Sequence, residues 1–93
     1  MNSRNRSQKS GGPTVTIQVA GKLFHGHLSY LNQLVESAAE YGLWPVLGLA
    51  RLEEIDHPAL AYLMAGEAHD FAIAACPDFI RKWMAHERRN QAA

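Results

Sequence analysis

Five side chains that can bind a metal ion or take part in catalysis lie in three short segments of the chain. They are His25 and His27, which flank one glycine, the adjacent pair Asp56 and His57, and Cys76, which is the single cysteine. Imidazole, carboxylate and thiolate groups together form a ligand set that suits Zn²⁺. The same groups could build a Cys-His hydrolase, in which a histidine activates the thiol and a carboxylate orients the histidine.

Each of these residues also has an ordinary structural role. Asp56 stands two residues before Pro58, and proline is favoured in the first turn of a helix, so Asp56 is expected to cap a helix. Loop histidines are commonly solvated, and Cys76 suits the apolar end of a strand. No oxyanion donor set accompanies the cysteine and histidines. We therefore expect no enzyme activity, cofactor or metal, and keep a small metal-dependent or Cys-His enzyme as the alternative.

The three segments each follow a predicted strand. Residues 14–20 alternate apolar β-branched and polar residues, which is typical of a strand with one buried face. Residues 44–49 are a short apolar run, which predicts a strand buried on both faces, and residues 70–75 predict a third strand. In a parallel sheet the loops after the strands emerge at one edge, so the five side chains could converge there.

Three helices are predicted between and after these strands. Apolar residues form one stripe over residues 28–41, and Gly42 stands where a C-cap glycine is wanted. The second helix spans residues 58–65 and stops at Gly66, and the third begins at Pro77. The buried stripe of the third helix is expected to contain Phe79, Ile80, Trp83 and Met84. The order βαβαβα predicts an α/β fold with a small, mainly parallel sheet and helices mostly on one face.

Composition restricts the class of protein. The 93 residues suit one small domain, and the formal net charge is zero. Residues 1–13 carry three basic residues and no acid, which predicts a disordered tail before a domain over residues 14–90. The domain is then mildly acidic, which argues against nucleic-acid binding. A lone cysteine and the lack of a membrane-length apolar run or signal peptide predict a cytoplasmic protein without membrane insertion.

The segment around Asp56 resembles the central motif of the STAS domains, the family of the anti-sigma-factor antagonists and of the cytoplasmic tails of sulphate transporters. In that family an apolar strand and a short polar stretch precede Asp-Ser-x-Gly-Leu at the start of a helix. The matching residues here are Asp56, His57, Pro58, Ala59 and Leu60, so the aspartate and leucine agree and the serine and glycine do not.

Two further segments support the resemblance, which covers about residues 14–88. Residues 19–23 look like the turn that closes an early strand in the family, and residues 75–80 look like its last loop and the start of its final helix. The family normally has one more strand at the start. Residues 1–13 are too polar and glycine-rich to supply that strand, so an edge and a face of the sheet are expected to remain open.

The resemblance implies a non-catalytic regulatory module that binds other proteins, of the anti-sigma-factor antagonist type. In that type a kinase phosphorylates the serine after the aspartate, and the added charge changes which partner docks. His57 occupies that position here, and no serine or threonine follows Ser37. The implied partners are an anti-sigma kinase-like protein, another STAS regulator or a transporter component. The open edge and face of the sheet separately predict a homodimer or a bound partner. The expected partner-binding residues are Asp56, His57, Pro58, Ala59, Leu60 and Tyr62.

Overall fold

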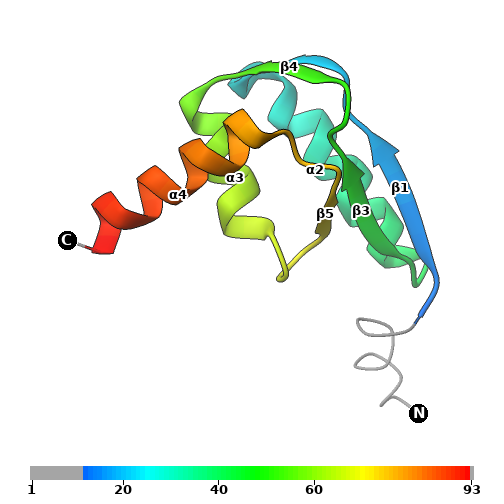
Figure 1. Cartoon of the computed structure of the whole chain (residues 1–93). Coiled ribbons are helices and arrows are strands. Elements are labelled where there is room, and N and C mark those ends of the chain that lie inside the picture. Colours follow the sequence, from blue (N-terminus) through cyan, green and yellow to red (C-terminus); the bar gives the residue numbers. More distant parts are fainter. Residues whose placement is uncertain (1–11, 93) are drawn as a thin grey trace.

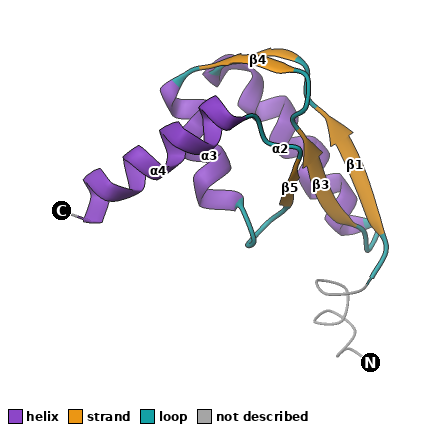
Figure 2. Cartoon of the chain, in the orientation of Figure 1, coloured by secondary structure: helices purple, strands orange, loops and turns teal. Residues whose placement is uncertain are grey.

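The computed structural model describes residues 12–92, which form an α/β fold (Figures 1 and 2), as predicted. The elements in chain order are β1 (Thr14–Gln18), β2 (Gly21–Leu23), the 3₁₀ turn η1 (His25–His27), α2 (Leu28–Glu40), β3 (Trp44–Gly48), β4 (Leu52–Ile55), α3 (His57–Gly66), β5 (Ala72–Ala74) and α4 (Asp78–Ala92). Most of the predicted tail lies outside the described residues. Its last two residues, Gly12 and Pro13, are described, and the Pro13 carbonyl accepts a hydrogen bond from the Trp44 N–H.

Strands β1, β3 and β5 form a three-stranded parallel sheet in that order. Ile17, Leu47 and Ile73 stand side by side across the three strands, and Leu47 is fully buried. Helices α2 and α3 lie next to each other, since the Tyr62 hydroxyl of α3 donates a hydrogen bond to the Asn32 side chain of α2. The three strands of this sheet lie in chain order and the two helices that connect them are neighbours, as predicted for parallel strands joined by helices on one face.

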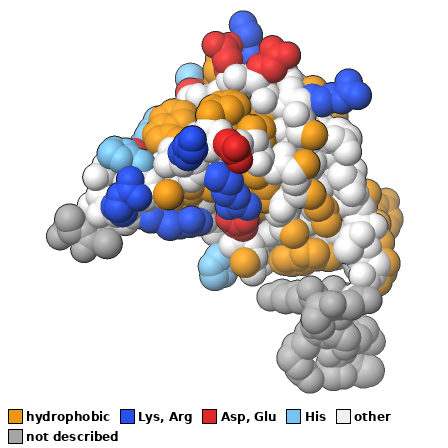
Figure 3. All heavy atoms as spheres, viewed as in Figure 1, with side chains coloured by type: hydrophobic (Ala, Val, Ile, Leu, Met, Phe, Trp, Pro, Cys, Tyr) orange, Lys and Arg blue, Asp and Glu red, His pale blue; other side chains and the backbone are white. Residues whose placement is uncertain are grey.

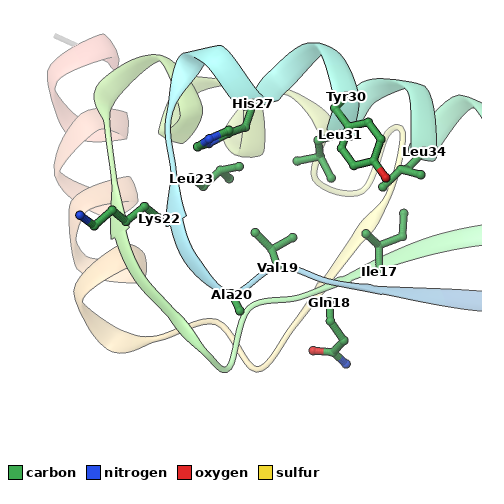
Figure 4. Close-up of a pocket in the computed structure, with 10 residues that line it drawn as sticks. All are labelled: Ile17, Gln18, Val19, Ala20, Lys22, Leu23, His27, Tyr30, Leu31 and Leu34. Atoms are coloured by element: carbon green, nitrogen blue, oxygen red, sulfur yellow. The ribbon is translucent and has the colours of Figure 1, made fainter.

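The other face of this sheet is open in the view of Figure 1, where α2 lies behind the strands. Figure 4 shows Ile17 and Val19 pointing toward α2, whereas Gln18 points away from it. Residues of the open face are small or uncharged, with Thr16 and Ala74 exposed and Val46 half-buried. Figure 3 shows apolar side chains scattered among polar atoms over this side of the molecule.

A second, two-stranded parallel sheet of β2 and β4 was not predicted. The first strand ends at Gln18, and Gly21, which was expected to end it, is instead the first residue of β2. Its φ of 75° turns the chain, and it pairs with Leu52 of β4. The sequence pattern misses these strands because they are short and expose Lys22 and Glu54, which face each other in register at 3.5 Å. The strands nevertheless belong to the core, because Leu23 and Leu52 are buried.

The ends of the helices explain two of the glycines. Gly42, with φ 78°, follows α2, and its N–H and that of Leu43 donate to the carbonyls of Ala39 and Ala38. This pair of bonds closes the last turn of the helix as a Schellman motif. Gly66 is the last residue of α3, and a Cβ atom there would overlap the ring of Phe71. Gly66 is therefore required by packing rather than by backbone conformation.

One part of the predicted core is wrong. Ile80 and Met84 of α4 are fully buried and Trp83 is half-buried, but 46% of Phe79 is exposed. Ile80 and Met84 are four residues apart and therefore share one face of the helix, whereas Phe79 is rotated about 100° from Ile80. Among residues 12–92, no helix is both long and apolar enough to cross a membrane.

Candidate functional site

The carboxylate of Asp56 holds together three segments at the start of α3. Its Oδ1 accepts the Ala59 N–H at 3.0 Å, which is the predicted N-cap bond. Its Oδ2 accepts the His25 N–H at 2.9 Å and lies 3.0 Å from Nδ1 of the His25 ring. Asp56 therefore joins the end of β4, the first turn of α3 and η1, a turn that lies 31 residues earlier in the chain.

The same contacts fix the charge of Asp56. Partial burial alone would raise the pKa of this carboxyl, but the hydrogen bonds from the His25 N–H, the His25 ring and the Ala59 N–H outweigh it. The pKa of Asp56 is lowered as a result, so the group is ionised at neutral pH. A negative charge at this position also interacts favourably with the positive end of the α3 dipole.

His57 occupies the position where the resemblance places a phosphorylated serine. Its side chain is 62% exposed, and Nε2 lies 3.1 Å from Oε1 of Glu87 on α4. The ring also packs against Trp83 at a centroid distance of 6.1 Å. The hydrogen bond to His57 lowers the pKa of Glu87 despite the partial burial of that carboxyl. His57 thus connects the start of α3 to α4 while one side of its ring remains open to solvent.

The six expected partner-binding residues do not form one exposed surface. Pro58 is exposed beside His57, but Ala59 and Leu60 have no exposed surface and belong to the hydrophobic core. A partner could touch these two residues only if the core opened. The solvent-accessible members of the set are therefore Asp56, which is partly exposed, together with His57, Pro58 and the half-buried Tyr62.

The Tyr62 hydroxyl is bonded within the protein. The hydroxyl donates to Oδ1 of Asn32 at 3.1 Å, and the ring stacks on Phe71 with centroids 5.6 Å apart. Burial, together with the negative charges of Asp70 and Glu36, raises the pKa of Tyr62. Its main contribution is to the contact between α2, α3 and the start of β5.

The five possible metal ligands do not converge as the sequence suggested. His25 is paired with Asp56, His57 is paired with Glu87, and Nδ1 of His27 accepts the N–H of Phe24 in the same turn. Over residues 12–92, no group of three or more His, Cys, Asp or Glu side chains is placed to hold a metal ion. The convergence fails because His25 and His57 are bonded to carboxylates on different elements and His27 is bonded within its own turn.

Cys76 is half-buried in the loop between β5 and α4. Burial raises the pKa of its thiol, and the carboxylates of Glu67 and Asp78 add to this effect, while Arg81 opposes it. The net result is a raised pKa, so the group is a neutral thiol at physiological pH. Both a nucleophilic cysteine and a zinc ligand require the thiolate, and this environment disfavours it.

A strong polar contact that the sequence pattern does not reveal connects α3 to α4. Both terminal nitrogens of Arg81 donate to the Glu67 carboxylate, at 2.9 and 2.7 Å, and Arg88 lies 3.7 Å from the same carboxylate. These two arginines lower the pKa of Glu67, mainly through the Arg81 hydrogen bonds and against partial burial. Glu67 and Arg81 are 14 residues apart, so helical spacing gives no signal of their pairing.

We expect Asp56→Ala to lower the melting temperature by about 5 °C, because α3 loses its N-cap and its connection to η1. Asp56→Asn keeps one oxygen that can accept the Ala59 N–H but loses the acceptor of the His25 N–H, so it should recover only the N-cap part of this loss. Differential scanning calorimetry of the three proteins at pH 7 measures the effect. Equal melting temperatures for Asp56→Ala and the parent would show that the cap contributes nothing.

The Glu67 contact predicts a specific pH dependence. Because its folded-state pKa lies below the ordinary value of 4.5, Glu67 contributes stability above that pH and loses it as the pH falls through the lowered pKa. Glu67→Gln should therefore be less stable than the parent by about 1 kcal/mol at pH 7, given the partial exposure of Arg81. The difference should shrink in urea titrations as the pH falls below 4.5 and through the lowered pKa. A difference that does not change with pH would contradict this origin.

Comparisons with family models, with curated proteins and with solved structures returned no match to this chain.

Proposed function

We propose that the chain is a non-catalytic, STAS-like module that binds a regulatory protein through the exposed corner at the start of α3. This corner consists of Asp56, His57 and Pro58. The partner belongs to the classes implied by the resemblance, an anti-sigma kinase-like protein, another STAS regulator or a component of a transporter. A second copy of the chain is a further partner that the open sheet permits.

The observation that carries this proposal is the geometry of Asp56. A single carboxylate caps α3 and binds η1, so the corner is held in one conformation before any partner arrives. His57 and Pro58 are exposed on that rigid corner. Preorganisation of this kind reduces the entropy lost on binding, which favours a docking surface on a domain of this size.

The corner differs chemically from a phosphorylation switch. His57 replaces the serine of the family motif, and no serine or threonine follows Ser37. A serine/threonine kinase therefore has no acceptor in residues 38–93. On this proposal the module presents one constant surface to its partner, comparable to the unphosphorylated form of a switching antagonist.

Two observations support binding over catalysis. The alternative enzyme needs a thiolate at Cys76 with a histidine beside it. The pKa of this thiol is raised instead, and His25 and His57 are each bonded to a carboxylate. The exposed residues of the corner remain available for contacts with a protein surface. We therefore propose no catalytic residue and no cofactor.

The test is a comparison of surface variants in affinity capture from the native cell, followed by measured affinities for the captured protein. His57→Glu and Pro58→Arg change exposed side chains, and each should weaken binding at least tenfold. Gln33→Arg is a matched control because it changes an exposed residue of α2, away from the corner. Circular dichroism should show that all three variants stay folded.

Two results would overturn the proposal. If His57→Glu and Pro58→Arg bind the captured protein as tightly as the parent does, the docking surface is not at this corner. If the purified chain carries stoichiometric zinc that a chelator removes with loss of stability, the enzyme alternative is correct instead.

A further inference from the structure

The free edge of β1 is a surface that the proposed function does not use. Among the described residues β1 pairs only with β3, so it forms one edge of the three-stranded sheet. Its sequence, Thr14 to Gln18, contains no charge, proline or glycine, and its pairing with β3 has no bulge. Natural edge strands usually carry such features, which block pairing with another strand.

The hydrogen bonds of the sheet show which backbone groups face outward. The carbonyl of Pro13 and the N–H of Val19 both bond to β3. Because backbone groups of alternate residues point to opposite sides of a strand, the N–H and C=O groups of Thr14, Thr16 and Gln18 point away from β3. These are the groups that a further strand would bind.

We propose that a second copy of this chain pairs with this edge, β1 against β1 in antiparallel orientation, about a two-fold axis at Thr16. In that register Thr16 faces Thr16 of the other copy, and Thr14 faces Gln18. All outward N–H and C=O groups of the strand are then bonded, and two three-stranded sheets become one of six strands. The pairing is isologous, as in most homodimers.

The side chains of β1 suit this register. Val15 and Ile17, which lie on the α2 side, face each other across the axis, and the uncharged Thr14, Thr16 and Gln18 meet on the open side. Apolar and β-branched pairs of this kind stabilise antiparallel strands. No like charges are brought into opposition within the paired strands.

The surface next to β1 is also suited to contact with another protein chain, because it is partly apolar. A groove of about 240 Å³ lies between β1, β2 and α2, and its walls include Ile17, Tyr30 and Leu34 (Figure 4). Tyr30 on α2 and Tyr41, which follows the last residue of α2, are 67% and 81% exposed, and they are two of the three large apolar side chains exposed in residues 12–92. Tyr30 and Leu34 are one turn apart on the same side of α2, so apolar surface accompanies the edge strand.

The sequence of β1 itself favours a second copy over an unrelated strand. In this register Thr16 meets Thr16, Thr14 meets Gln18 and Val15 meets Ile17, so every side chain of the strand faces an uncharged partner of its own kind. A second copy supplies this match by symmetry.

This inference does not depend on the proposed docking corner, because β1 and the start of α3 are separate parts of the molecule (Figure 1). Sedimentation equilibrium of the full chain tests it. The parent should dimerise, and Thr16→Lys, which places two like charges at the axis, should weaken the dimer at least tenfold. Ala74→Lys adds the same charge to the open face at the far strand β5 and should leave the dimer intact.

A cross-linking experiment fixes the register. In a Cys76→Ala background, Thr16→Cys should form a disulfide-linked dimer under mild oxidation, because directly opposed residues of an antiparallel pair lie within disulfide range. Thr14→Cys alone should not, since it faces Gln18. A parent that stays monomeric at millimolar concentration, a Thr16→Lys dimer as stable as the parent dimer, or equal cross-linking by both cysteine variants would overturn the proposal.

Discussion

Gly66→Ala is expected to lower the free energy of unfolding by about 2 kcal/mol, although alanine is a better helix former than glycine. A Cβ atom at position 66 would overlap the ring of Phe71, which is fully buried and stacked on Tyr62. Relieving that overlap requires the ring or the end of α3 to move, at a cost of about 3 kcal/mol. The gain of about 1 kcal/mol in helix propensity offsets only part of it.

Thermal unfolding measures this effect, and the expected decrease in melting temperature is about 10 °C. Gly26→Ala is the matched control, because a Cβ atom there has no neighbour within 4 Å. The control should unfold within about 2 °C of the parent. If Gly66→Ala is as stable as the control, Phe71 does not pack against the end of α3 as described.

Ala59→Asp should have the largest effect of the substitutions considered. Ala59 has no exposed surface, so a carboxylate there is buried without a partner. Such a group destabilises a protein by about 4 kcal/mol, a large part of the 5–15 kcal/mol available to a typical domain. We expect a melting temperature about 20 °C lower, or no cooperative transition.

Ala61→Asp controls for the charge and for its position near the start of α3, because Ala61 is exposed. It should change stability by less than about 0.5 kcal/mol. Urea titration of both variants distinguishes the two outcomes. A folded Ala59→Asp protein with parent-like stability would mean that Ala59 faces solvent and could contact a partner after all.

The predictable parts of this fold are those that local patterns specify. Alternation over β1, the apolar stripe of α2 and the glycine at position 42 correctly placed those elements, because each is determined by neighbours within a few residues. The N-cap role of Asp56 was predictable for the same reason. The segments β2 and β4 were not, because strands of three or four residues with exposed charges have no distinctive period.

The candidate site was predictable in its location but not in its contacts. The pairing of His25 with Asp56 and of His57 with Glu87 joins residues about 30 positions apart. Which histidine meets which carboxylate depends on how the helices pack, and a single sequence does not encode that in any local pattern. The same reason explains why the Glu67–Arg81 contact was missed and why Ala59 and Leu60 were assigned to a surface.

Chemical-shift mapping tests the proposed docking corner most directly. The ¹⁵N-labelled chain would be titrated with the protein captured from the native cell, and amide shifts would be followed residue by residue. The proposal predicts that the largest changes fall on the amides of residues 24–27, 56 and 57, which Asp56 joins at the start of α3. Changes confined to other surfaces, with these amides unaffected at saturation, would contradict it.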